Sequence, residues 1–156
     1  MRTFLVAILH LTPCAALAHP VDQVSQGAYL TLSPGKVALE LDIVPGAEVA
    51  GAIVQALDAD ADKSITRTEA RAFAQTVLDR SALLLDGVAA SWTLGDVNVP
   101  GYATLLSGND LPKITATADR PDSAGAHELR YENAYAPAKT KRAANIFLLP
   151  GGGWQY

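Results

Sequence analysis

The chain is 156 residues long, with 49% hydrophobic and 18% charged residues and a formal net charge of −4. An acidic chain without a basic run argues against a nucleic-acid-binding surface. Beyond the first eighteen residues no apolar stretch approaches the length of a membrane span, so we expect no transmembrane segment there.

The N-terminal segment is organised like a secretory signal peptide. Arg2 gives a positive start, residues 4–11 form an apolar run, and Ala16-Leu17-Ala18 is a small-x-small cleavage site. We therefore predict a signal peptide at residues 1–18 and a periplasmic or secreted location.

The only cysteine, Cys14, lies inside this segment. It raises a lipoprotein signal as the alternative, although Pro13 before it fits poorly. Without Cys14 the mature chain has no thiol and no disulfide. We expect residues 19–156 to form a single β-rich domain.

Two strands are predicted first. Residues 28–32 are apolar, a Ser-Pro-Gly turn follows, and apolar and polar residues then alternate over 36–43 as in a half-buried strand. Pro45-Gly46 ends the second strand.

A helix, an acidic loop and a second helix are predicted over residues 47–80. Apolar residues recur at helical spacing from Val49 to Leu57 and again from Ala70 to Leu78. Thr66 and Glu69 form a capping-box pair that would start the second helix.

The loop between these helices, Asp58 to Glu69, places side-chain oxygen donors at its positions 1, 3, 5, 9 and 12. Calcium takes about six to eight oxygen ligands, so side chains spaced in this way on a tight loop converge on one ion. We predict Ca²⁺ as the ligand; a solvated acidic loop is the alternative. The expected ligands are Asp58, Asp60, Asp62, Ser64 through its backbone carbonyl, Thr66 and Glu69.

Three details modify this prediction. Glu69 cannot serve fully as helix cap and as ligand, and we expect the metal to take it. Lys63 stands at the sixth loop position, where the chain turns with positive φ; a non-glycine residue there costs about 1–2 kcal/mol. Its ammonium also lowers the local negative charge, so we expect weakened binding. Ile65, at the eighth position, would pack the loop against a core.

Strands resume after Arg80. Asp86-Gly87 between two apolar runs predicts a hairpin over 83–90. Further strands are expected at 103–106, 113–118, 128–132 and 143–149. The predicted fold is mostly β, an antiparallel sandwich or barrel with an inserted helix-loop-helix EF-hand.

His19 and His127 support a second hypothesis. After cleavage His19 would be the first residue, able to bind nickel, cobalt or copper through its α-amine and imidazole. We expect His127 to share the strand face of Leu129 and Tyr131 as a partly buried, hydrogen-bonded residue. The alternative function is thus a periplasmic transition-metal-binding domain linked to a metal transporter.

Catalytic motifs are absent from the sequence. It has no Gly-x-Ser-x-Gly, no His-Glu-x-x-His, no phosphate-binding glycine loop and, in the mature chain, no cysteine nucleophile. We expect a binding or structural module rather than an enzyme.

The segment Asp58 to Glu69 resembles the EF-hand family. The layout of the chain is also similar to the extracytoplasmic N-terminal domain of bacterial hydrogenase/urease nickel-accessory and nickel/cobalt-transporter membrane proteins. That similarity rests on Ala18-His19-Pro20, on Leu57 to Asp60 and on His127 to Pro137. The first resemblance implies calcium binding; the second implies a periplasmic location and a membrane transporter or other envelope protein as partner.

Overall fold

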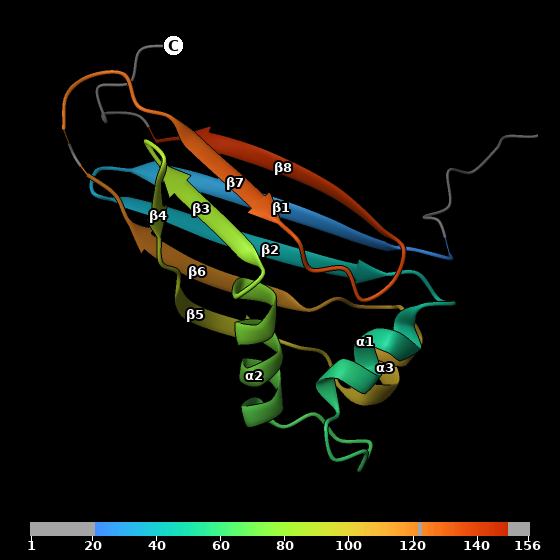
Figure 1. Ribbon diagram of the computed structural model, residues 1–156. Coiled ribbons are helices and arrows are strands. Elements are labelled where there is room, and N and C mark those ends of the chain that lie inside the picture. Colours follow the sequence, from blue (N-terminus) through green and yellow to red (C-terminus); the bar gives the residue numbers. More distant parts are fainter. Residues whose placement is uncertain (1–20, 122, 150–156) are drawn as a thin grey trace, which may run out of the picture.

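The computed structural model describes residues 21–121 and 123–149. The predicted signal peptide (1–18), His19 and the C-terminal Trp154 lie outside the described residues. The fold is mostly β, as predicted, and these described residues form two sheets and three helices (Figure 1). In chain order the elements are β1 (Val24–Ser33), β2 (Lys36–Pro45), α1 (Ala50–Leu57), α2 (Arg67–Leu78), β3 (Ser81–Leu85), β4 (Val88–Ala90), β5 (Thr93–Asn98), α3 (Tyr102–Leu106), β6 (Lys113–Asp119), β7 (Leu129–Asn133) and β8 (Thr140–Leu148).

The larger sheet has the strand order β5-β6-β2-β1-β8. β1 and β2 form an antiparallel hairpin in which Leu30 pairs with Leu39 and Ala28 with Leu41. Burial alternates along both strands, so one face of the sheet carries apolar side chains and the other carries polar ones. The predicted period-two pattern of the second strand is confirmed.

One pairing in this sheet departs from the predicted antiparallel arrangement. β8 runs parallel to β1, with Val24 opposite Thr140 and Leu32 opposite Leu148. Parallel neighbours need a long crossover connection. Here nearly the whole domain forms that connection, a long-range relation that local sequence patterns do not encode.

The smaller sheet has the order β4-β3-β7 and lies over one face of the larger sheet (Figure 1). The predicted hairpin is confirmed between β3 and β4, where Asp86 and Gly87 have φ of 51° and 78°. Two successive positive φ angles match the right-handed twist of paired strands. Leu83 of β3, 1% exposed, joins the core of the larger sheet.

The helical segment lies between β2 and β3, as predicted, and its two helices pack at one end of the sheets (Figure 1). α1 buries Ile53 and Leu57, and α2 buries Phe73 and Val77. Fully burying side chains of this size stabilises a fold by about 1.5–3 kcal/mol each.

The strand predicted at 103–106 is wrong: these residues belong to α3. A short apolar run fits a strand or a helix equally well from sequence. The helix is selected here because Leu105 N–H bonds Gly101 O at 3.0 Å and the Leu105 side chain is completely buried. Among the described residues, no helix combines the length and apolar character that a membrane crossing requires.

Candidate metal site

Packing of the two helices fixes both ends of the acidic loop. Asp58 follows Leu57, the last residue of α1, and Thr66 is the N-cap of α2. Leu57 is fully buried, and Ala70 in the first turn of α2 is 7% exposed. The loop therefore leaves and re-enters the domain at positions that the core holds.

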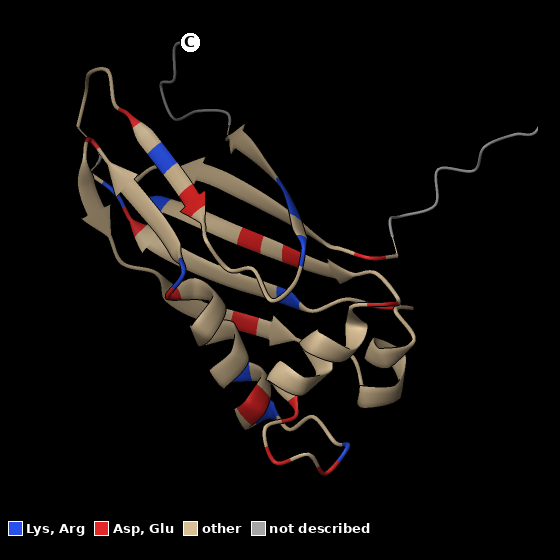
Figure 2. Cartoon of the chain, turned by 45° about the vertical axis from the view of Figure 1, so that its right-hand side comes forward, with Lys and Arg blue, Asp and Glu red and all other residues tan. Residues whose placement is uncertain are grey.

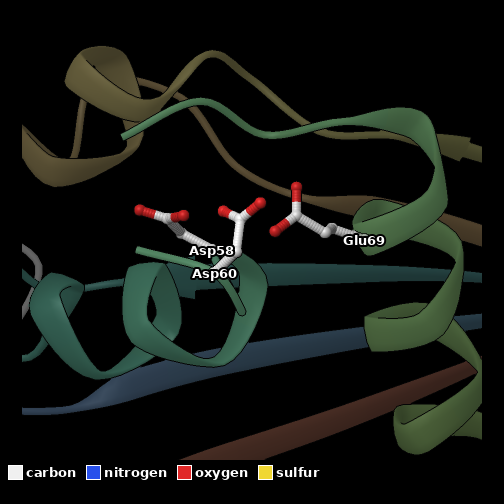
Figure 3. Close-up of side chains that lie close together, drawn as sticks. All are labelled: Asp58, Asp60 and Glu69. Carbon is white, nitrogen blue, oxygen red and sulfur yellow. The ribbon is translucent and has the colours of Figure 1, made fainter. Parts of the chain in front are cut away.

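Three carboxylates converge within this loop. Oxygen atoms of Asp58, Asp60 and Glu69 lie within 4.8 Å of one another, and Figure 3 shows the three carboxylates close together, with Glu69 reaching from the start of α2 toward Asp60. Asp58 is 8% exposed, so one carboxylate is buried beside two that are more accessible. Acidic residues gather at this loop, with basic residues of the loop and of α2 beside them (Figure 2).

Backbone N–H groups hold the loop around Asp58. Its Oδ1 accepts a hydrogen bond from Asp62 N–H at 3.1 Å and its Oδ2 accepts one from Lys63 N–H at 3.0 Å. Asp60 Oδ1 also accepts from Asp62 N–H, at 3.3 Å. Short acidic side chains bonding to nearby backbone in this way fold a turn locally.

Glu69 links the two ends of the loop. Its Oε1 accepts from Ala59 N–H at 2.9 Å, and its Oε2 accepts from Thr66 N–H and the Thr66 hydroxyl at 2.9 and 2.8 Å. The Thr66 hydroxyl in turn accepts from Glu69 N–H, so the predicted capping box is present. The N–H and then the hydroxyl of Thr66 are the main causes that lower the pKa of Glu69, which keeps this carboxyl ionised.

The backbone of the loop turns with positive φ where the sequence predicted it. Lys63 has φ of 66°, and Ala61, two residues earlier, has φ of 59°. Both are non-glycine residues in the left-handed region. The loop thus adopts a tight turn at two sites where its sequence does not favour one.

The remaining predicted ligands lie outside the three-carboxylate group. Asp62 Oδ1 accepts from Ser64 N–H at 2.7 Å, and the Thr66 hydroxyl is engaged with Glu69. Ile65 is partly buried and packs against the core, as expected. The three carboxylates offer only oxygen, which is the donor set of hard cations such as Ca²⁺ and Mg²⁺ rather than of nickel or copper.

A second polar cluster forms around His127, which the structure places before β7 and not on the strand face of Leu129 and Tyr131. Its Nδ1 lies 2.7 Å from Asp86 Oδ2 and its Nε2 lies 2.9 Å from Ser123 O. The side chain is hydrogen-bonded, as predicted, but the residue is exposed rather than partly buried, and its partner Asp86 was not foreseen. Asp86 was visible in the sequence only as a turn residue.

The order Asp86, His127, Ser123 has the residue types of a catalytic triad, but its geometry does not favour nucleophilic activation. The Ser123 hydroxyl is 3.4 Å from Nε2, whereas the Ser123 carbonyl is 2.9 Å away and needs a proton on that nitrogen. A nitrogen that donates to a carbonyl cannot also accept the serine proton. The cluster therefore fastens the 123–128 segment to the β3–β4 hairpin.

Comparison of the chain with family models, with curated proteins and with solved structures finds no match.

Proposed function

We propose that the chain is a secreted or periplasmic calcium-binding module in which one EF-hand-type loop stabilises a β-rich domain. The observation that carries the proposal is the convergence of the Asp58, Asp60 and Glu69 carboxylates within 4.8 Å on a loop between two packed helices. Like charges so close repel one another, and a cation bound among them would relieve that repulsion.

The ion would connect α1 to α2. Asp58 and Asp60 follow α1, and Glu69 is in the first turn of α2, so a bound cation shares its ligands between both helices. Calcium would compete with the capping box for the oxygens of Glu69 and with backbone N–H groups for those of Asp58. This competition, together with the positive φ of Lys63, supports an affinity near the weak end for such loops, about 10⁻⁴–10⁻³ M.

An affinity in that range suits a constitutive stabiliser outside the cell. Ligand binding to the folded state adds RT ln(1 + [L]/Kd) to the free energy of unfolding, about 1.4 kcal/mol when calcium is at ten times Kd. Calcium would then fasten the helical end of the domain rather than act as a switch.

The test is a calorimetric titration with calcium, with magnesium, nickel and copper as comparison ions. Glu69→Gln is the informative variant because a glutamine can still cap α2 while it withdraws a charged ligand. Glu48→Gln is the matched control, since Glu48 is exposed and lies outside the loop. We expect saturable calcium binding and a rise in Tm for the wild type and for Glu48→Gln, with both lost in Glu69→Gln.

Absence of calcium heat and of a thermal shift up to millimolar calcium would contradict the proposal. A nickel or copper signal that survives Glu69→Gln would instead support the transition-metal alternative.

A further inference from the structure

The larger sheet ends in two edge strands that differ in protection. β5 carries a register irregularity between Leu94 and Val97, and Arg71 of α2 donates to its Gly95 O at 3.2 Å. Bulges and covering elements are common ways to block an edge strand. β8, at the opposite edge, is nine residues long and exposed from Lys141 to Phe147 (Figure 1).

Hydrogen bonds to β1 determine which β8 groups point outward. Lys139 O accepts from Val24 N–H, and Leu149 N–H donates to Leu32 O, so odd-numbered residues face β1. Even-numbered residues, among them Arg142, Ala144 and Ile146, direct N–H and C=O to the free edge. Within the described ranges, none of these outward backbone groups of 142, 144 and 146 has a hydrogen-bond partner.

Side chains beside this edge are apolar at one end and basic at the other. Ile146 and Phe147 are 55% and 50% exposed, and Phe147 stacks on Tyr29 of β1 with ring centroids 6.5 Å apart. Lys141 and Arg142 occupy the first half of the strand, which is basic in an otherwise acidic chain (Figure 2).

We propose that β8 pairs with β8 of a second copy of this chain, antiparallel across a two-fold axis through Ala144. In this register Ala144 faces Ala144 of the second copy, Arg142 faces Ile146, and Lys141 faces Phe147. No like charges are opposed, and an ammonium beside an aromatic ring is favourable. A parallel, in-register pairing would set Lys141 beside Lys141, which argues for the antiparallel one.

Self-pairing explains why β8 is basic in its first half and apolar in its second half. The apolar residues of one copy cover the long side-chain stems of the basic residues of the other, and the two alanines leave room for close approach at the axis. The two larger sheets then join into one continuous sheet, and the unpaired N–H and C=O groups are satisfied.

Sedimentation velocity of the purified chain over micromolar to several hundred micromolar concentrations tests the proposal. We expect a concentration-dependent shift from monomer to dimer. Ile146→Lys would oppose Arg142 of the other copy and raise the dissociation constant at least about tenfold. Ile146→Glu, which pairs with that Arg142, should keep the dimer.

Ala144→Pro removes an outward N–H without removing a bond to β1, so it should leave the melting curve close to wild type and abolish the dimer. Thr93→Lys, an exposed site on β5, is the control that should dimerise normally. If Ala144→Pro does not fold, the comparison of Ile146→Lys with Ile146→Glu still tests the proposed dimer.

A monomer at every concentration, or a dimer that survives Ile146→Lys, would overturn the proposal, and equal loss in the two Ile146 variants would overturn this register. A monomer that nevertheless binds a synthetic extended peptide along β8 would give the edge another occupant and equally refute self-pairing.

Discussion

Lys63 shows how one residue can oppose the conformation that its own loop requires. Its N–H donates to Asp58 Oδ2 only because the chain turns there with φ of 66°. A side chain with a Cβ is strained in that region, and its ammonium adds positive charge to the loop that we propose binds calcium. Strain and charge are separable, since the first belongs to the backbone and the second to the end of the side chain.

Lys63→Gly should relieve both effects, and Lys63→Gln only the charge. We expect Lys63→Gly to stabilise the metal-free protein by about 1 kcal/mol and Lys63→Gln to leave the free energy of unfolding nearly unchanged. Both should tighten calcium binding. Urea denaturation in chelator and calorimetric titration measure the two quantities. Equal stability of the two variants in chelator would mean that the positive φ costs little.

At the scale of elements, Asp86 connects the β3–β4 hairpin to the segment before β7, through its ion pair with His127 and through hydrogen bonds with the backbone of Glu128. Asp86 Oδ1 accepts from Glu128 N–H at 2.8 Å while its Oδ2 meets His127, and Asp86 N–H donates to Glu128 O at 2.8 Å. The turn residue thus binds the neighbouring segment through both backbone and side chain.

This pair should make stability depend on pH. The hydrogen bond to Asp86, followed by that to Ser123 O, raises the pKa of His127 above its ordinary 6.5, although nearby Arg120 acts in the opposite direction. The contribution of His127 is therefore complete below about pH 6.5 and lost as pH rises through the raised pKa. The hydrogen bond from His127 lowers the pKa of Asp86 below 3.8, so its contribution is lost only as pH falls through that lowered value.

We expect His127→Gln to lower Tm more at pH 5 than at pH 8.5, because the stabilisation from the charged histidine decreases as pH rises through its raised pKa. Thermal melts of the wild type, His127→Gln and Asp86→Asn at both pH values check this. Asn is chosen at 86 because it tolerates the positive φ of that turn. An identical loss at the two pH values would show that the charge of His127 does not contribute.

Local chemistry explains which elements could be predicted from the sequence. The hairpin at Asp86-Gly87, the capping box at Thr66 and the alternating strand over 36–43 each depend on residues close together in the chain, and each is confirmed. The strand prediction for residues 103–106 was wrong because a run this short shows neither the helical nor the strand spacing of apolar residues. The site divides in the same way. Of the six ligands that the loop spacing predicted, Asp58, Asp60 and Glu69 lie close together. The contact of Asp86 with His127, which was not predicted, depends on tertiary pairing of β3 with β7.

At the scale of the whole molecule, one core serves both sheets and the helices. It contains residues of β1, β2 and β6, Leu83 of the smaller sheet, Leu105 of α3, and Phe73, whose ring meets Tyr135 edge-on at 5.8 Å. Because these elements share buried neighbours, we expect the domain to unfold as one cooperative unit.

Leu41→Ala should be strongly destabilising, since Leu41 is fully buried at the middle of β2. We expect a loss of about 2–5 kcal/mol in the free energy of unfolding from lost burial and the resulting cavity. Val88→Ala, at a residue 70% exposed, is the control and should change it by less than about 0.5 kcal/mol. Urea denaturation monitored by tryptophan fluorescence gives both values, and similar values for the two would show that Leu41 is not in a tightly packed core.

The parallel pairing of β1 with β8 has a consequence for the order of assembly. β1 and β2 are adjacent in sequence and can pair early, but β1 keeps an open edge until β8, which follows every other described strand, docks beside it. A chain that emerges from a ribosome from its N-terminus must therefore produce β8 before this sheet is complete. During that delay the edge of β1 is available to any other unpaired strand, so the domain is most exposed to misassembly in the interval before β8 has emerged.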